Sequence, residues 1–347
     1  MAAVTAPDLA PASPKAKTRR RSQHPALAFL ARRLAVGVVT LFVVSFLIFM
    51  ATNALPGNVA QVVLGKNATP ARVALLEHQL GLNRSLLTQY GSWLGGLIHG
   101  SLGQSSVQLA QGATSAPVSS IIGTPLRNSL VLGLIAVLLL IPLGLLTGTI
   151  AAMHAGKRAD FAVSYTSLVL GSLPEFVLGT FFILIFFSWL GLLPPVSLVP
   201  PGSSPLAHSN ALVLPVLTLL GTGLAFSARQ VRAGVVESLR ADYVTAARLG
   251  GIRERRVLLR YALRNALAPS VQTFAQSIQY LFGGIVVVEA LFDYPGIGTL
   301  LLNAVQTQDV TEVQAIAIVL AALYILINLV ADLLVVMLVP KLRTGLS

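Results

Sequence analysis

Side chains able to do chemistry are few in this sequence, and they form no catalytic pattern. The chain has no cysteine, which excludes thiol nucleophiles, disulfides and cysteine-ligated metals. It contains no GxxxxGK[ST] phosphate loop and neither the HExxH nor the GxSxG pattern of hydrolases. The histidines are scattered, which disfavours a metal site: His24, His78, His99, His154 and His208. The sequence therefore predicts a chain without enzyme activity, cofactor or metal of its own.

Polar residues inside long apolar runs are the remaining candidates. A charge within a membrane-spanning helix is costly, so it usually faces a protein interior or an aqueous path. Glu175 is a translocation-path candidate, because Pro174 before it disturbs backbone pairing. For Glu175, and more so for Glu289 and Asp332, structural bonding to a neighbouring helix is the competing interpretation. Three uncharged residues carry the same two interpretations: Gln276, Gln279 and Asn328.

The longest charged stretch, residues 229–265, carries nine arginines between two apolar runs. Within it the pattern predicts a short helix from Ala241 to Leu249, ended by two glycines that tolerate a left-handed backbone. A second helix is expected to follow along the membrane face and to turn inward near Pro269. A membrane protein that keeps one long basic segment in the cytoplasm is expected to dock a partner there.

Three residues of the short helix suit a docking surface. Ala246 and Ala247 are small, so a partner can approach the backbone closely, and Tyr243 offers an aromatic anchor for a pocket.

The elements that must position these residues are membrane-spanning helices. The 347 residues are 55% hydrophobic and 10% charged, with a mean hydropathy of +0.79. These values favour one polytopic membrane domain over a water-soluble globule. Six apolar runs are long enough to cross the bilayer, at about residues 34–55, 129–153, 161–190, 211–228, 266–288 and 313–339.

The distribution of positive charge predicts the orientation. The net charge is +12, and all but four of the 24 Lys and Arg residues fall on one side of the six-span topology. That side is the cytoplasm by the positive-inside rule, so both termini are expected there, and the charge needs no nucleic-acid partner. Residues 1–33 are predicted as a disordered basic tail, residues 56–124 as an extracytoplasmic loop and residues 229–265 as a cytoplasmic loop.

Several motifs together carry a resemblance to a known family. Thr245-Ala246-Ala247 followed by Gly251 fits the Glu-Ala-Ala, three residues, Gly spacing of the coupling loop in permease subunits of ATP-driven importers, with Thr245 in place of Glu. Further markers resemble the dipeptide, oligopeptide and nickel permease branch: Leu55-Pro56-Gly57, Thr124 to Leu130, Pro174, Asp242 to Asn265, Pro295-Gly296-Ile297-Gly298, and Asn328 with Asp332. The resemblance covers about residues 33 to 341.

The resemblance implies an all-α permease fold of the type I importer class, over residues 34–341, in the plasma (inner) membrane of a bacterium. It implies a homologous permease partner, two ATPase subunits or a fused pair that bind ATP and Mg, and an extracytoplasmic substrate-binding protein. Di- or oligopeptides are the expected cargo, with nickel, haem or another small solute as the alternative. The residues expected to couple to an ATPase are Asp242, Tyr243, Ala246, Ala247 and Gly251.

Two other protein classes remain open. An ATP-independent channel or secondary transporter usually shows internal repeats of broken helices, and no clear repeat is seen. A membrane-embedded hydrolase needs a nucleophile and a base or a metal cluster, and the sequence supplies neither pattern.

Overall fold

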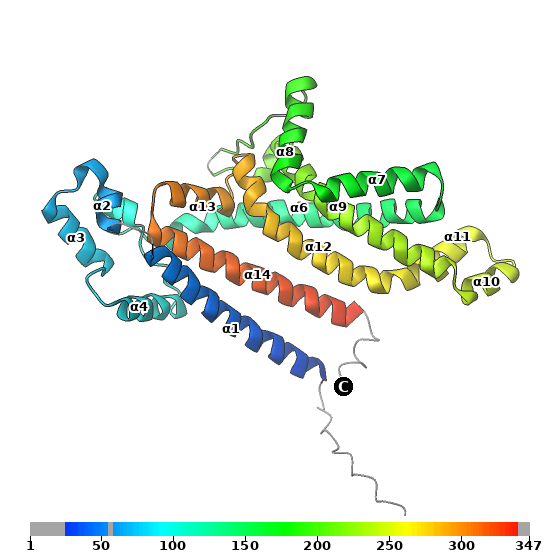
Figure 1. The fold of residues 1–347 in the computed structure, drawn as a ribbon, viewed down its shortest axis with the longest axis horizontal. Helices are drawn as coiled ribbons and strands as arrows, with labels where there is room; N and C mark the ends of the chain where they lie inside the picture. The colour runs from blue at the N-terminus through cyan, green and yellow to red at the C-terminus, as the bar shows by residue number, and fades with distance from the viewer. Residues whose placement is uncertain (1–24, 55–57, 201, 339–347) are drawn as a thin grey trace, which may run out of the picture.

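The computed structural model describes residues 25–54, 58–200 and 202–338, and within these ranges the chain is helical without a regular strand. Figure 1 shows the arrangement. The α-helices are α1 (Pro25–Asn53), α2 (Val59–Leu64), α3 (Pro70–Leu80), α4 (Leu86–Ile98), α5 (Ser106–Ala110), α6 (Val118–Met153), α7 (Arg158–Ser172), α8 (Glu175–Ile183), α9 (Ser209–Leu239), α10 (Asp242–Leu249), α11 (Glu254–Arg256), α12 (Leu263–Leu291), α13 (Ile297–Gln306) and α14 (Val310–Leu338). Short helices of other types are η1 (Gly65–Asn67), η2 (Leu184–Trp189), η3 (Pro205–His208) and η4 (Val257–Ala262), of which η2 and η4 are π-helical.

Among the described residues, five helices are long and apolar enough to cross a membrane, and the bent pair α7 and α8 makes a sixth candidate. The expected third span, residues 161–190, is therefore not one helix. The chain bends by 110° between its two halves, α7 and α8. Leu173 is extended, with φ −95° and ψ 134°, as expected for a residue before proline, and Pro174 cannot donate a backbone hydrogen bond.

Two helices extend beyond the spans that hydropathy predicts: α6 begins at Val118, before residue 129, and α9 runs on to Leu239, past residue 228. The chain is also helical without interruption from Glu254 to Leu291, so it does not turn inward near residue 269. Hydropathy reports which part of a helix is apolar enough for lipid, and not where the helix itself begins or ends.

The core lies where α6, α9 and α12 pack together. Its largest buried side chains include Leu132, Leu140, Leu219 and Leu281. Glycines bring the backbones close: a Cβ placed on Gly148 of α6 would lie 2.7 Å from the carbonyl oxygen of Ala228 in α9. Close approach through small residues is the usual way that helices associate within a membrane.

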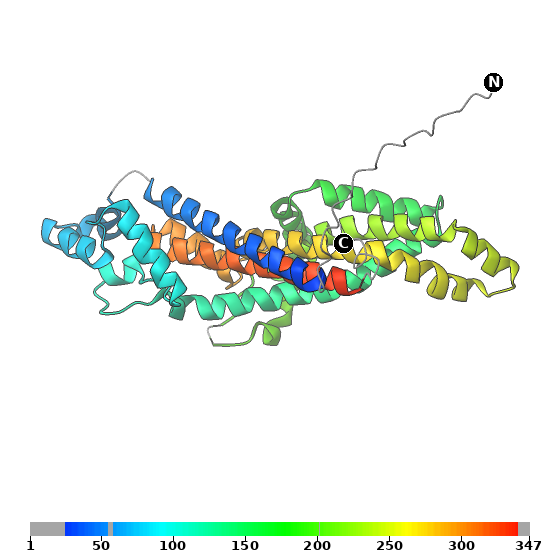
Figure 2. The same ribbon diagram turned by 90° about the horizontal axis from the view of Figure 1, so that it is seen from below.

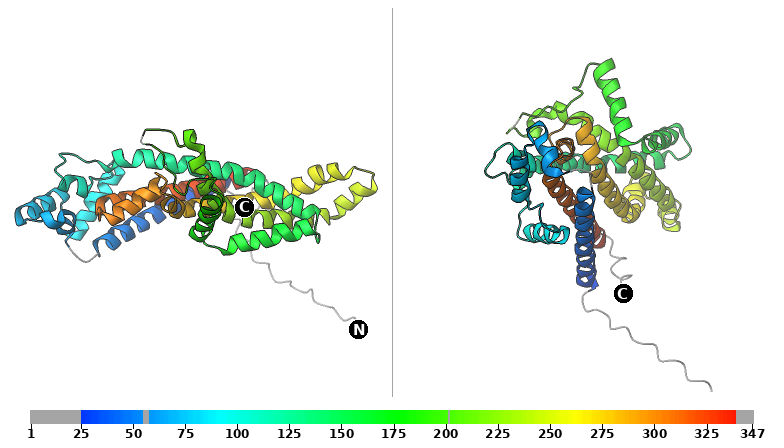
Figure 3. Two further views of the ribbon diagram at one scale, coloured as in Figure 1. Left: turned by 90° about the horizontal axis from the view of Figure 1, so that it is seen from above. Right: turned by 60° about the vertical axis from the view of Figure 1, so that its left-hand side comes forward.

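The remaining elements lie around this core. α14 packs against α12 of the core, α1 runs beside α14 on its outer side, and α8 projects from the bundle (Figures 1 and 3). Helices α2 to α4 lie at one end of the long axis, and α10 and α11 lie at the opposite end (Figures 1, 2 and 3). The segment from α2 to α4 and the helices α10 and α11 are therefore far apart.

Residues 58–117 are folded against the bundle. Asp309, which is buried at the start of α14, accepts hydrogen bonds from the Ser106 hydroxyl (2.9 Å) and from the backbone amides of Ser106 and Val107 (3.1 Å each). At the other edge, Tyr90 of α4 packs its ring against Phe46 of α1, with the ring centroids 5.5 Å apart. These contacts give the segment fixed anchor points on α14 and α1.

Candidate coupling surface and translocation face

Helix α10 forms where the sequence predicts it, from Asp242 to Leu249. Gly250 caps its end, and the backbone of Gly251 is left-handed, with φ +75°. A residue with a Cβ is strained in that conformation, so the second glycine is required by the turn. The turn is closed by the amide of Ile252, which donates to the Ala247 carbonyl at 3.2 Å.

The two faces of α10 have different environments. Val244 and Ala247 are buried against Val257 of η4 in a small apolar cluster. Ala247 is therefore not on the exposed face where the sequence analysis expected it, because a residue three positions after Val244 lies on the same side of the helix.

The exposed face holds the other predicted residues and one that was missed. Asp242, Tyr243 and Ala246 are exposed, and so is Leu249, whose side chain is 85% exposed. The exposure of Leu249 could have been predicted from the sequence, because residues spaced three apart, such as Tyr243, Ala246 and Leu249, lie on the same side of a helix.

An ion pair joins the end of α10 to α11. The Arg248 guanidinium contacts both carboxylate oxygens of Glu254, with Nη2–Oε1 at 2.5 Å and Nε–Oε2 at 3.1 Å. This partner holds the pKa of Glu254 below its ordinary value. Both side chains are exposed, so the pair adds little to stability, and its two contacts link the end of α10 to the start of α11.

A second ion pair ties the α6–α7 turn to α9. Arg232 donates from Nε and Nη2 to the buried carboxylate of Asp160, with the Nη2–Oδ2 distance at 2.7 Å. Asp160 also accepts from the Gly156 amide at 2.8 Å. α10 follows α9 directly, so this pair lies close to its base, and the sequence analysis did not single it out.

The structure brings two translocation-path candidates to one region. Gln276 lines a cavity of about 300 Å³ between α7, α9 and α12, together with Gly171, Thr222, Gly223, Phe226, Arg229, Ser277 and Tyr280. Tyr280 also interacts with the half-buried Glu175. Glu175 in turn lies over Gly284, one turn further along α12, where a Cβ would meet its Oε1 at 2.9 Å. Glu175, Tyr280 and Gln276 therefore form a polar row along α12.

The other two candidates lie elsewhere. Gln279 is half-buried on α12 and does not line this cavity. Asn328 lines a groove between α1 and α14, beside an ion pair in which Arg33 Nε lies 3.1 Å from Asp332 Oδ2. The Asp332 carboxylate is thus bonded to a neighbouring helix, as its structural interpretation expected.

Glu289 also has a structural partner. Its Oε2 accepts from the Gly298 amide at 2.7 Å, and the carboxylate occupies the space that a side chain at Gly296 would need. The same turn meets a distant sequence marker, since Asn128 donates to the Pro295 carbonyl at 2.8 Å and Ser129 accepts from the Ile297 amide at 2.8 Å. Two of the sequence markers, Thr124 to Leu130 and Pro295 to Gly298, are thus in direct contact.

Comparison with known proteins adds independent findings. Residues 144–344 match the family "Binding-protein-dependent transport system inner membrane component", and residues 26–123 match the N-terminal region of such membrane components. The chain is 34% identical over 318 residues to a glutathione transport system permease protein of Shigella flexneri. It is 32% identical over 321 residues to a protein of Sinorhizobium fredii named "Probable peptide ABC transporter permease protein". Each alignment covers 91% of this chain and 99% of the relative.

The family match spans α9, α10 and α12, and it includes the turn at residues 295–297 that contacts Asn128. Members of this family are non-catalytic membrane subunits, which agrees with the sequence analysis. The chain therefore belongs to the inner-membrane permeases of binding-protein-dependent ATP-driven import systems.

Proposed function

We propose that this permease pairs with a homologous permease subunit and that the two enclose a path for di- or oligopeptides. Import is driven by two ATPase subunits, or a fused pair, which bind ATP and Mg. An extracytoplasmic binding protein delivers the cargo, and both termini are cytoplasmic. The same machinery importing nickel, haem or another small solute is the alternative. Support for a peptide comes from relatives named as peptide or glutathione permeases.

The observation that carries the proposed mechanism is the mounting of α10. Its exposed face, Tyr243, Ala246 and Leu249, is free to enter a surface cleft of an ATPase, while Val244 and Ala247 fix it to η4. α10 lies between the end of α9 and the uninterrupted helix α11–η4–α12. When ATP closes the ATPase pair, movement of α10 is passed directly to α9 and α12.

Those two helices also line the polar cavity that holds Gln276 and Tyr280. Displacing α9 relative to α12 changes the access to this cavity from either side of the membrane, which is the requirement for alternating access. The Arg232–Asp160 pair makes the α6–α7 turn follow the same movement.

The test is uptake into liposomes by the co-expressed complex of permeases and ATPases. Labelled trialanine is supplied with the binding protein, and di-, tri- and oligopeptides, nickel and haem are used as competitors. We expect uptake to need ATP and the binding protein and to be blocked by peptides. The permease chain alone is the matched control, and we expect it to be inert.

The outcomes separate the parts of the proposal. ATP-dependent uptake of labelled nickel or haem, supplied in place of labelled trialanine and not blocked by peptides, would overturn the cargo and leave the mechanism. Transport by the permease chain alone would overturn the mechanism and favour a channel or secondary transporter.

A further inference from the structure

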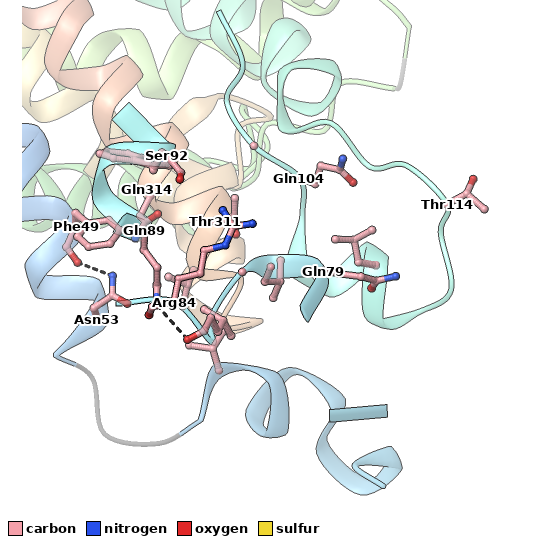
Figure 4. A pocket seen from close by; sticks show the side chains of 18 residues that line it. Phe49, Asn53, Gln79, Arg84, Gln89, Ser92, Gln104, Thr114, Thr311 and Gln314 are labelled. Carbon is pink, nitrogen blue, oxygen red and sulfur yellow. Dashed lines mark hydrogen bonds between the residues drawn. The ribbon is translucent and has the colours of Figure 1, made fainter. Parts of the chain in front are cut away.

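A cavity of about 500 Å³ lies at the end of the molecule opposite α10, and nothing above assigns it a role. It is walled by the end of α1, the α3–α4 turn, α4, residues 103–114 and the start of α14 (Figure 4). We call it the N-terminal cavity. Its volume falls within the range of ~300–1,000 Å³ that is usual for small-molecule sites. It is larger than the cavity at Gln276.

The charge of the N-terminal cavity is positive. Arg84 is the one charged residue among the 18 that line it, and no Asp or Glu is among them. Within the part of the chain that the structure describes, the Arg84 guanidinium makes no ion pair. In Figure 4 the Arg84 side chain lies between the two groups of polar side chains that face the cavity. A planar guanidinium without a partner is suited to bind a carboxylate through two parallel hydrogen bonds.

Hydrogen bonds hold the backbone of the turn that carries Arg84. The Gln89 amide donates to the carbonyl oxygens of Leu82 (3.1 Å) and Arg84 (2.8 Å), which clamps the turn that carries the arginine. Gln314 is held in a similar way, since its amide donates to Thr52 at 2.6 Å. Asp309 anchors residues 105–107, which lie between the lining residues Gln104 and Leu109. The exposed Arg84 side chain thus extends from a preformed turn.

Further polar groups remain for a ligand. The side-chain amides of Gln79 and Gln104 make no hydrogen bond within the described residues, and they lie on the opposite side of the cavity from Gln89 and Gln314 (Figure 4). The indole nitrogen of Trp93, in the same wall, is buried and has no hydrogen-bond partner in the described part of the chain. Because this nitrogen has no accessible surface, the Trp93 ring offers a ligand in the cavity apolar surface only.

Part of the cavity wall is apolar. Phe49 and Trp93 lie with their ring centroids 5.9 Å apart, and Leu80, Leu109 and Val310 add aliphatic surface. A ligand for this cavity needs a carboxylate for Arg84, amide groups for the glutamines and small apolar parts. A short peptide has all three.

We infer that the N-terminal cavity binds a short peptide, with its C-terminal carboxylate on Arg84, before the peptide enters the path between the permeases. This inference rests on the proposed peptide cargo. It adds a site outside the bundle, with Arg84 as the group that selects a free carboxylate.

The lack of cysteine allows a direct test. Gln104→Cys places a single thiol in the exposed part of the cavity wall. Labelling of that thiol by a maleimide is followed on this chain in the full complex in nanodiscs, without ATP or binding protein. The probes are trialanine and trialanine amide, which differ in the terminal carboxylate. We expect trialanine to protect the thiol, and the amide to need about tenfold higher concentration, the effect of losing a charge-assisted hydrogen bond.

Two arginine variants make the test specific. Arg84→Gln in the Gln104→Cys background should weaken the protection by trialanine about tenfold. Arg72→Gln, an exposed arginine of α3 that does not line the cavity, is the matched control and should leave protection unchanged. Arg84→Lys keeps the charge and should restore part of the protection, which shows that the loss in Arg84→Gln is not unfolding.

Equal protection by trialanine and its amide would overturn the inference, and so would full protection in Arg84→Gln. Absence of protection at millimolar trialanine, in a complex that imports trialanine, overturns the inference alone. A complex that imports no peptide overturns the proposed cargo, whatever the labelling shows.

Discussion

At the residue scale, the short helix α10 has a buried face that packs against η4 and an exposed face that we propose for docking. Tyr243, Ala246 and Leu249 face outward, and Val244 and Ala247 face inward against Val257. The sequence alone identified the helix and its glycine end, because both depend on local backbone preferences. It did not identify the inward face, because that face is set by η4, whose position relative to α10 is a tertiary property. Two adjacent alanines therefore have different expected roles.

Replacing each alanine with arginine should separate these roles. Ala246→Arg should reduce copurification of the ATPase subunits by about tenfold or more, as loss of an interface hot spot does, while α10 stays folded. Ala247→Arg forces a charge into the cluster with Val244 and should unfold α10 as well. Hydrogen exchange of the α10 amides, measured beside copurification, distinguishes the two variants.

Ala68→Arg, an exposed alanine at the other end of the molecule, is the control and should change neither measurement. Normal copurification in Ala246→Arg would remove Ala246 from the docking face.

At the scale of elements, the packing of α6 against α9 depends on where glycine lies. Gly148 leaves no room for a Cβ beside Ala228 and Val231, whereas Gly123 on the same helix has no neighbour within 4 Å of a Cβ. Hydropathy predicted the presence of both helices and could not tell one glycine from the other. The 110° bend at Pro174 has the same explanation: proline predicted a disturbed backbone, but the angle depends on how α8 packs against α9.

Alanine at these two glycines should have opposite effects on thermal stability. Gly148→Ala should destabilise the complex by ~1–3 kcal/mol, because the methyl group forces α6 and α9 apart. Gly123→Ala should be neutral or stabilising by up to ~1 kcal/mol, because alanine favours the helix. The unfolding temperatures of the purified complexes test this pair. A Gly148→Ala complex as stable as the wild type would show that the α6–α9 contact can relax.

At the scale of the whole molecule, α10 and the N-terminal cavity lie at opposite ends of the long axis (Figures 1 and 2). Charge counting predicted that these regions lie on opposite sides of the membrane. The sequence could not predict the cavity, since its walls come from residues as far apart as Phe49 and Gln314. Asp309, which anchors one wall, did carry a sequence signal, as the first residue of an Asp-x-x-Glu capping pattern ending at Glu312.

Single cysteines test the orientation in intact cells. Gln104→Cys should react with a membrane-impermeant maleimide added to spheroplasts, and Ala246→Cys should react only after the cells are opened. Both positions are exposed in the folded chain, and the variants are expressed without the ATPase subunits, so a difference in labelling reports the membrane side and not burial. Labelling of Ala246→Cys in closed spheroplasts would reverse the predicted orientation.

The uninterrupted helix from Glu254 to Leu291 has a mechanical consequence. Its parts have 3, 6 and 29 residues, which at 1.5 Å per residue give a rod of roughly 55 Å. The far end is pinned, because Glu289 holds the Gly298 amide and the Phe292 carbonyl accepts from Ser197 at 2.7 Å. With that end as a fulcrum, each degree of tilt sweeps the base beside α10 through about 1 Å. Leverage of this kind converts a motion of several ångströms at the docking surface into a rotation of only a few degrees across the membrane.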